Sequence, residues 1–386
     1  MERVKIPLVD LKREYIFLKR RIEKQIKECL KTHHWILGEK LKEFEERIKK
    51  YLGVRYAIGV ASGTDALLLS LRALALKIKK EEFFAREDEI ITTPLTFIAT
   101  AEAIIRSGAT PVFVDIDEDT FNISPQAIEK AISKNTKGIV VVHLYGQACK
   151  MDSILKIADK HNLFVIEDCA QSFGAQFKGK KLGTWGNVGA FSFFPSKNLG
   201  AYGDAGLIIT RDLKLAQLVT YLRNHGQKKK YKASYIGYNS RLDSLQAGVL
   251  LTKLDYIDGF NKKRIEIAKI YNQALKEIEE IKVPQIPDEE FRHVFHLYTL
   301  CVKKRRNKLL KFLKNKGIEA RIYYPQLIPF MKAFSSLNKT KNISSALKIK
   351  REILSLPLHP FLKEKEIKYI ISQVKKFFSN HIRRVC

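Results

Sequence analysis

Short apolar segments alternate with amphipathic segments along most of the first 210 residues. Four or five consecutive apolar residues between turn residues predict buried strands, and apolar positions three and four residues apart predict helices. The predicted strands are 56–60, 89–92, 111–114, 138–142, 163–166, 190–194 and 207–210. The predicted helices between them are 39–51, 66–77, 99–107 and 151–161. This alternation is typical of a mainly parallel sheet covered on both faces, so we expect an α/β fold.

The pattern changes after Ser240, where longer helical periods replace the strands. Helices are predicted over 242–254, 258–279, 307–316 and 364–378, with one strand over 295–302 and a break marked by Pro284 and Pro287. A chain of 386 residues exceeds one simple core. We therefore expect a large domain over 1–255 and a smaller α+β domain over 256–386. The N-terminal helical segment, 1–55, is a candidate to pack on the smaller domain.

The composition is that of an ordinary globular protein. No apolar run approaches the roughly 20 residues of a membrane span, and the opening Met-Glu-Arg-Val-Lys is no secretory leader. The five cysteines are scattered, odd in number and without a C-x-x-C pair. Disulfides and a structural zinc are therefore not expected, and a reducing cytoplasm fits the sequence.

The formal net charge of +29 raises the question of an anionic partner. The lysines are spread along the chain and alternate with glutamates in helical stretches, and the densest clusters, 228–230 and 303–306, lack the interleaved aromatics of a stacking platform. We expect no nucleic-acid partner. A generally lysine-rich composition is the first interpretation, and attraction of small anionic substrates is the second.

The strongest candidate for chemistry is Lys197, in the segment Gly189-Ala-Phe-Ser-Phe-Phe-Pro-Ser-Lys-Asn-Leu-Gly200. Pro195 ends the aromatic strand, and the glycines that follow permit a tight reversal into the next strand. A single lysine is surface charge by default. Its place on a rigid turn makes a catalytic role more plausible.

Two further sites follow predicted strands. Ser62-Gly63-Thr64 can cradle a phosphate at a helix N-terminus, although helix capping by Thr64 or Asp65 explains the same residues. Asp168 ends a buried strand, with Gln171 one turn further on. A carboxylate at that depth needs a cationic partner, such as a protonated pyridine, or several donors, and a helix cap or buried ion pair is the alternative.

Other candidates have ordinary explanations beside the functional ones. Phe97 can lie against a cofactor ring, but an aromatic after a strand usually belongs to the core. His33-His34 and His293-x-x-His296 lack a third ligand at suitable spacing, so we expect hydrogen-bonded histidines and no metal. Asn224, in Arg223-Asn-His-Gly226, has no evident role beyond helix capping. A cradle, an aromatic, a carboxylate and a lysine together suit a Schiff-base cofactor such as pyridoxal phosphate.

The ordered motifs resemble the DegT/StrS family of pyridoxal-phosphate-dependent nucleotide-sugar aminotransferases over nearly the whole chain. The motifs are Leu37-Gly38, Ala61-Ser-Gly-Thr-Asp-Ala-Leu67, Thr96-Phe-Ile-Ala-Thr100, Gly108-Ala-Thr-Pro-Val-Phe-Val-Asp115, His143-Leu-Tyr-Gly-Gln147, Glu167-Asp-Cys-Ala-Gln171, Phe191-Ser-Phe-Phe-Pro-Ser-Lys-Asn-Leu-Gly200, Arg223-Asn-His-Gly226 and Asn239-Ser-Arg-Leu-Asp243. The resemblance implies the type I aminotransferase fold, with a large seven-stranded mixed sheet, and a homodimer with its sites at the interface.

The resemblance also implies roles for single residues. Lys197 would form the Schiff base with the cofactor and Asp168 would pair with the pyridine nitrogen. The other implied cofactor contacts are Gln171 near the phenolic oxygen, Phe97 on the ring, Gly63, Thr64 and Ser192 at the phosphate, and Asn224 from the neighbouring subunit. Arg241 is a guess for the donor carboxylates, and Tyr323 and Tyr324 lie in a segment that borders the sugar in the family.

The expected reaction moves an amino group from an amino acid, L-glutamate first among the candidates, to a nucleoside-diphosphate keto sugar. The Tyr-Tyr-Pro segment lacks the histidine that many members carry, so the sequence leaves open the sugar, the nucleotide and the 3- or 4-keto position. Two alternatives are another type I pyridoxal enzyme acting on amino acids and a non-catalytic, basic nucleic-acid-binding regulator. An intact Lys197 and Asp168 disfavour the second.

Overall fold

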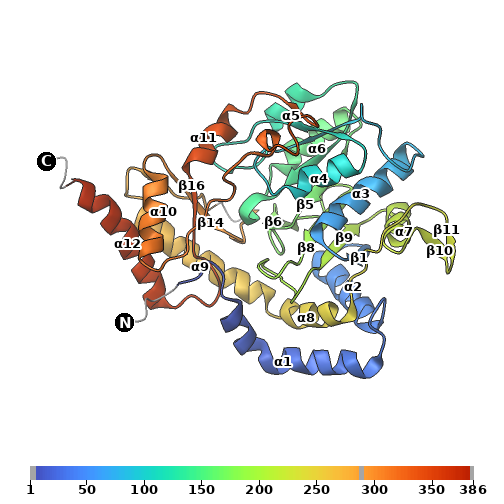
Figure 1. Ribbon diagram of the computed structural model, residues 1–386, viewed down its shortest axis with the longest axis horizontal. Helices are drawn as coiled ribbons and strands as arrows, with labels where there is room; N and C mark the ends of the chain where they lie inside the picture. The colour runs from blue at the N-terminus through green and yellow to red at the C-terminus, as the bar shows by residue number, and fades with distance from the viewer. Residues whose placement is uncertain (1–5, 287–290, 383–386) are drawn as a thin grey trace.

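An eight-stranded sheet forms the centre of the structure, with the strand order β1-β9-β8-β5-β4-β2-β3-β15 (Figure 1). The computed structural model describes residues 6–286 and 291–382, so the opening Met1–Lys5, Pro287 and Cys386 lie outside the described residues. In sheet order the strands are β1 (Tyr56–Val60), β9 (Gly206–Thr210), β8 (Val188–Ser192), β5 (Phe164–Asp168), β4 (Thr136–Val142), β2 (Glu89–Thr92), β3 (Thr110–Phe113) and β15 (Lys339–Thr340).

Strand direction in this sheet is mostly parallel. β9 runs antiparallel to both of its neighbours, β1 and β8, and the other neighbouring pairs are parallel. The first seven strands in the sheet order correspond to the expected seven-stranded mixed sheet. The eighth, β15, comes from the C-terminal part of the chain and pairs with β3.

Helices cover both faces of the sheet, as the apolar strands predict. Along β4, Ile139 and Val141 belong to one hydrophobic cluster and Val140 belongs to another, because successive side chains of a strand point to opposite faces. On the Val140 face lie α3 (Gly63–Ile78), α4 (Ala99–Arg106) and α7 (Leu213–Leu222). On the other face lie α2 (Glu39–Leu52), α5 (Pro125–Ala131), α6 (Met151–Lys160) and α8 (Ser244–Leu254).

The C-terminal part has its own hydrophobic cluster and a three-stranded antiparallel sheet. Its elements are α9 (Ile257–Leu275), β12 (Ile281–Lys282), β14 (Tyr298–Val302), α10 (Arg306–Asn315), α11 (Ser344–Glu352), β16 (Ile353–Leu356) and α12 (Glu364–Ile382). Ile6 is buried in this cluster and bridges to Ile318, while α1 (Leu11–Thr32) lies along α8 (Figure 1). The N-terminal segment therefore contacts both parts of the chain.

Short elements complete the described chain. They are η1 (Leu144–Gly146), β6 (Gln176–Phe177), β7 (Lys180–Lys181), β10 (Gln227–Lys229), β11 (Lys232–Ala233), β13 (Phe291–Arg292) and η2 (Ile328–Phe330). Among the described residues no helix is both long and apolar enough to span a bilayer. The four described cysteines, Cys29, Cys149, Cys169 and Cys301, are buried and free.

Several observed boundaries differ from the predicted ones for local reasons. α3 begins at Gly63 instead of Ala66, because the Ser62 hydroxyl accepts the Asp65 N–H at 3.0 Å and caps the helix. Capping by Thr64 or Asp65 was therefore the wrong alternative. β14 begins at Tyr298 instead of Phe295, and α9 ends at Leu275, four residues earlier than predicted.

Candidate active site

The carboxyl ends of the central parallel strands place the predicted site residues along one edge of the sheet. Asp168, the last residue of β5, pairs in register with Val142 of β4 and Ala190 of β8. Ser192 ends β8 two residues later, and Ser62 follows the end of β1. Ligands of open α/β sheets collect at this edge, so the sheet brings together polar groups that are distant in the sequence.

Asp168 is buried and is held from two sides. Its Oδ2 accepts a hydrogen bond from Thr100 Oγ1 at 2.9 Å, and its Oδ1 accepts the Ala170 N–H at 3.1 Å. Burial raises the pKa of Asp168, and these hydrogen bonds together with the charge of Lys197 oppose that rise. The carboxylate is thus oriented but retains lone pairs for a further donor.

Lys197 sits on the rigid turn that the sequence predicts. Its N–H donates to Phe194 O at 2.8 Å, and the Ala201 N–H donates to Phe193 O at 2.8 Å. A Cβ on Gly200 would lie 2.4 Å from Pro195 O, so the turn closes only with glycine there. Within the described chain, the Lys197 ammonium makes no hydrogen bond or ion pair. Burial lowers its pKa to about 8, and the nearby Asp168 charge opposes that shift.

The N-terminus of α3 lies closely against Ser192. A Cβ on Gly63 would come within 2.5 Å of Ser192 Cβ, so only glycine allows this approach. Ser62 caps the helix through Asp65, while the N–H groups of Gly63 and Thr64 have no acceptor within the described part of the chain. Free N–H groups and the helix dipole favour an anion at this position.

Gln171, Tyr324 and Phe97 form an amide and aromatic wall beside Asp168. Gln171 Oε1 accepts the Tyr145 N–H at 2.7 Å, and its Nε2 donates to Tyr324 Oη at 3.0 Å. The Tyr324 ring lies 6.2 Å from the Phe97 ring, centroid to centroid. Phe97 is 53% exposed, so it does not belong to the core. Tyr323 is tied to the same wall, because its carbonyl accepts the Tyr145 hydroxyl.

Asn224 and Arg241 are not brought into contact with these residues. They contact each other instead, with Arg241 Nη1 donating to Asn224 Oδ1 at 3.0 Å. Asn224 follows the end of α7, and Arg241 precedes α8. Within one chain, the structure shows no contact between this pair and Lys197 or Asp168.

A buried carboxylate beneath the site, Glu167, is fully used by protein donors. It accepts the N–H groups of Gly183, Trp185 and Gly186 at 2.7–2.8 Å and pairs with His143 Nε2 at 3.0 Å. His143, Glu167 and Cys169 lie close enough to suggest a metal cluster. His143 Nδ1 already accepts the Cys149 N–H at 3.1 Å, so neither its ring nor Glu167 is free for a metal.

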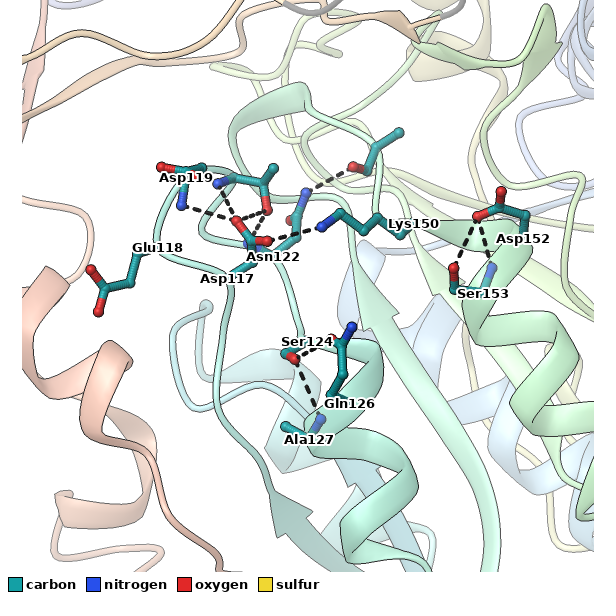
Figure 2. Close-up of polar contacts among 12 residues, drawn as sticks. Asp117, Glu118, Asp119, Asn122, Ser124, Gln126, Ala127, Lys150, Asp152 and Ser153 are labelled. Atoms are coloured by element: carbon teal, nitrogen blue, oxygen red, sulfur yellow. Dashed lines mark hydrogen bonds and ion pairs between the residues drawn. The ribbon is translucent and has the colours of Figure 1, made fainter.

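The acidic run after β3 is also accounted for by protein contacts. Asp117 accepts hydrogen bonds from the N–H groups of Asp119 and Thr120. It also forms an ion pair of 3.0 Å with Lys150, which lies just before α6 (Figure 2). Glu118 pairs with Lys348 at 2.6 Å, and Asp119 pairs with a lysine of β12. These contacts make the run a surface ion-pair network and not a candidate site.

Sequence reasoning missed several neighbours of the site. Thr100 was noticed only within a motif, although it contacts Asp168 directly. Asn198, beside Lys197, is buried and bonded to Asn261 and His296. The His293-x-x-His296 spacing was a visible signal, and the expectation of hydrogen-bonded histidines is correct for both.

The sequence matches one known protein family over most of its length. The model of the DegT/DnrJ/EryC1/StrS aminotransferase family matches residues 17–375. A pleiotropic regulatory protein of Geobacillus stearothermophilus is 41% identical over 97% of this chain and 98% of its own length. A dTDP-3-amino-3,6-dideoxy-alpha-D-galactopyranose transaminase of Aneurinibacillus thermoaerophilus is 40% identical over 96% and 99%, respectively.

A solved structure extends the likeness to the fold. The crystal structure of S. venezuelae DesV in complex with a ketimine intermediate superposes with a TM-score of 0.91 at 35% sequence identity. The match covers 97% of this chain and 98% of that one. The sheet and the C-terminal part described above are thus those of a fold type I aminotransferase.

Proposed function

The chain belongs to the DegT/DnrJ/EryC1/StrS aminotransferase family, and from this premise we propose that it transfers an amino group from L-glutamate to a nucleoside-diphosphate keto sugar. Enzymes of this family are pyridoxal-phosphate-dependent, and so is this one. The observation that carries the proposal is the placement of Lys197 and Asp168 at the same edge of the sheet, near enough for each charge to change the other's pKa.

The residues at this edge fit pyridoxal phosphate. Asp168 has lone pairs left for a protonated ring nitrogen, and Phe97 offers an exposed aromatic face. The free N–H groups at the start of α3, with the Thr64 and Ser192 hydroxyls, suit the phosphate. When bound, the cofactor supplies an electron sink for a carbanion formed at the carbon that bears the amine.

Lys197 is proposed to bind the cofactor and then to move a proton. A lysine with a pKa of about 8 is partly unprotonated near neutral pH, so its Nζ can accept the proton from the α-carbon of the donor. An ordinary lysine, with a pKa near 10.4, would be almost fully protonated there. The burial that lowers the pKa thus prepares the amine for its role.

Asp168 is proposed to keep a proton on the pyridine nitrogen. Thr100 and Ala170 fix its two oxygens, so the carboxylate needs no reorganisation when the ring binds. Gln171, held between the Tyr145 N–H and Tyr324 Oη, would lie near the phenolic oxygen of the ring. Asp168 and Gln171 would hold the ring from two sides.

The proposed active enzyme is a homodimer. Within the described chain Asn224 makes no hydrogen bond to Lys197 and pairs with Arg241 instead, which supports its assignment to the phosphate site of a neighbouring subunit. Arg241 would then face the same neighbouring site, where it is our candidate for a donor carboxylate. Tyr323 and Tyr324 border the space beside Asp168 and are the candidates for sugar contacts.

The proposed acceptor is a sugar with a 3-keto group on a nucleoside diphosphate. The Aneurinibacillus relative is named for a 3-amino sugar linked to dTDP, and its similarity covers nearly the whole chain. The net charge of +29 is favourable for attracting a diphosphate, although this acts on the rate of association more than on specificity. The cytoplasm, where activated sugars and reduced thiols occur together, is the proposed compartment.

One experiment tests the function and separates it from the alternatives. The cofactor-loaded protein is first treated with L-glutamate, freed of small molecules, and then offered 3-keto and 4-keto sugars on dTDP, UDP and GDP. The proposal expects the original absorbance to return with a 3-keto sugar. Return with amino-acid-derived keto acids alone would support another pyridoxal enzyme. Salt-sensitive DNA binding without any spectral response would support a regulator, as the name of the Geobacillus relative suggests.

A further inference from the structure

The turn that carries Lys197 is held by backbone hydrogen bonds at its ends and not at its centre. The N–H groups of Lys197 and Ala201 each donate to a carbonyl oxygen of the preceding aromatic segment. Within the described chain, the N–H groups of residues 198–200 make no backbone hydrogen bond. Leu199 is buried in the core, but apolar burial has no directional preference. Only a polar side chain can supply a directed contact at the centre of the turn.

Asn198, the residue after Lys197, makes three directed contacts. It is buried, and its Nδ2 donates to Asn261 Oδ1 at 2.8 Å and to Val294 O at 3.2 Å. A carbonyl oxygen can only accept, so the amide nitrogen of Asn198 faces Val294. Both amide hydrogens are then used, and Asn198 Oδ1 faces His296 Nδ1 at 3.1 Å and accepts from it. Each polar atom of the side chain thus has a partner in a fixed direction.

The first partner, Asn261, connects Asn198 to the loop after β5. Asn261 lies on α9 and is fully buried. Its Nδ2 donates to Phe173 O at 3.1 Å, so its Oδ1 is turned toward Asn198. A Cβ on Gly174 would lie 2.7 Å from Asn261 Nδ2, because the loop passes directly over this amide. The same loop carries Gln171, two residues before Phe173.

A second route from Asn198 to Gln171 runs through the segment before β14, residues 293–297, which packs along η1. The His296 N–H donates to Tyr145 O at 2.8 Å. The Tyr145 N–H donates to Gln171 Oε1 at 2.7 Å. Two routes, one through α9 and one through η1, therefore join Asn198 to the residue that we expect near the phenolic oxygen of the cofactor ring.

We propose that Asn198 is a positioning residue for Lys197, because it fixes the lysine turn relative to the loop that carries Gln171. The aldehyde carbon of pyridoxal phosphate lies on the ring position next to the phenolic oxygen. The lysine amine must meet that carbon at a distance of about 3–3.5 Å to react with it. One buried amide thus sets the lysine against the ring. The inference rests on the proposed role of Lys197.

Two forms of the cofactor separate this role from general packing. Pyridoxal phosphate carries an aldehyde, which condenses with the amine of Lys197 and releases water. Pyridoxamine phosphate carries an amine in place of the aldehyde, so it can use Asp168 and the phosphate contacts but cannot bond to the lysine. The ratio of the two affinities therefore reports on the position of Lys197 and not on the rest of the site.

The chain offers a matched control for the substitution of Asn198. Asn198→Leu removes all three contacts and keeps a side chain of similar size. Asn122 is also buried, its Nδ2 donates to two carbonyl oxygens at 3.0 and 3.1 Å, and its Oδ1 accepts one N–H at 3.0 Å, all within residues 144–148. Asn122→Leu therefore removes an equivalent set of contacts that does not include the lysine turn. Lys197→Ala removes the amine itself.

Equilibrium titration of the cofactor-free protein with each cofactor form gives the ratio. The wild type should bind pyridoxal phosphate more tightly, and Lys197→Ala should abolish this preference. Asn198→Leu should weaken binding of pyridoxal phosphate about tenfold and slow its uptake by a similar factor, because a misplaced reacting group loses at least that much. Its affinity for pyridoxamine phosphate should stay unchanged. Asn122→Leu should change both affinities by the same factor, so its ratio should equal that of the wild type.

The outcomes distinguish this inference from the proposed function. A wild type without a preference that depends on Lys197 overturns the role of the lysine, and the inference with it. A normal wild-type preference that is kept in Asn198→Leu, with either no loss or equal losses for both forms, overturns the inference alone. Should Asn198→Leu not fold, Asn198→Ser decides by the same ratio, because a serine hydroxyl has one proton and cannot donate to both Asn261 and Val294.

Discussion

The Thr100 hydroxyl donates a hydrogen bond to Asp168 Oδ2 over 2.9 Å, joining the first turn of α4 to the end of β5. Phe97 lies three residues before Thr100, so the aromatic residue and the carboxylate are held by one short segment. Thr100 therefore connects Phe97, which is predicted to stack on the cofactor ring, with Asp168, which is predicted to pair with the ring nitrogen. We expect that replacing Thr100 changes the pKa and the orientation of the Asp168 carboxylate.

Thr100→Val should weaken pyridoxal phosphate binding about tenfold, since a hydrogen bond to a charged group contributes about 1.5 kcal/mol or more. Loss of the donor removes a contact that opposes the rise in the pKa of Asp168, so less carboxylate is present near neutral pH. The loss should be largest at acidic pH and shrink as the pH rises. Absorbance titrations from pH 6 to 9 measure it. Thr96→Val removes a hydroxyl that lies 3.3 Å from Thr100 Oγ1 and does not bond to Asp168 among the described residues, so it should lose much less affinity.

Lys197→Met should stabilise the cofactor-free protein below pH 8 by about 1–2 kcal/mol, allowing for the partial exposure of the lysine. Burial lowers the pKa of Lys197 to about 8 in the folded state, so folding carries the cost of burying its charge. Between pH 8 and the ordinary lysine pKa the unfolded chain binds more protons, and wild-type stability rises with pH. The difference in the free energy of unfolding between the variant and the wild type, measured by urea unfolding, should therefore decrease as the pH rises above 8. A pH-independent difference, like that expected for exposed Lys214→Met, would contradict the prediction.

Phe97→Ala should reduce cofactor affinity roughly 3- to 10-fold, the range expected for losing an aromatic stacking contact. The side chain is half exposed, so the free energy of unfolding of the cofactor-free protein should change by less than about 0.5 kcal/mol. The comparison is Phe17→Ala on α1, which is similarly exposed and distant from Asp168. Equal affinity losses in both variants would exclude a specific stacking role.

Mixing two inactive variants tests the intersubunit site. If Asn224 serves the neighbouring subunit, a heterodimer of Lys197→Ala and Asn224→Ala contains one site with both changes and one with neither. Activity should therefore reappear on mixing after subunit exchange, up to about half of wild type per mixed dimer. Each variant alone should remain impaired. Failure to recover activity, with exchange verified by mass, would place Asn224 in its own subunit's site, and an Asn224→Ala variant that is fully active alone would place it outside any site.

The sequence predicted the sheet well because its strands are short apolar runs with clear ends. Tyr56–Val60 and Glu89–Thr92 were predicted with the bounds observed, and the helix predicted over 39–51 is observed as Glu39–Leu52. β15 was not predicted, because it consists of only two exposed residues, Lys339 and Thr340, and so shows no alternation of apolar and polar positions. The local sequence pattern therefore predicted the strands that are buried.

The sequence predicted which residues carry the chemistry of the site, but not the hydrogen bonds that hold their neighbours in place. Lys197 and Asp168 were marked by a turn and a strand end, which are local features. Asn198 and His296 lie 98 residues apart, and only the packing of the segment before β14 on η1 brings them together. For Phe97 the strand pattern favoured the core, but its exposure reflects the open edge of the sheet.

The most direct test of the account is to locate the cofactor on the chain. The protein loaded with pyridoxal phosphate is reduced with borohydride, digested, and analysed by mass spectrometry for a pyridoxyl group. The account predicts one modified residue per subunit, Lys197, and no stable modification in Lys197→Ala. A pyridoxyl group on another lysine, or on none, would contradict it.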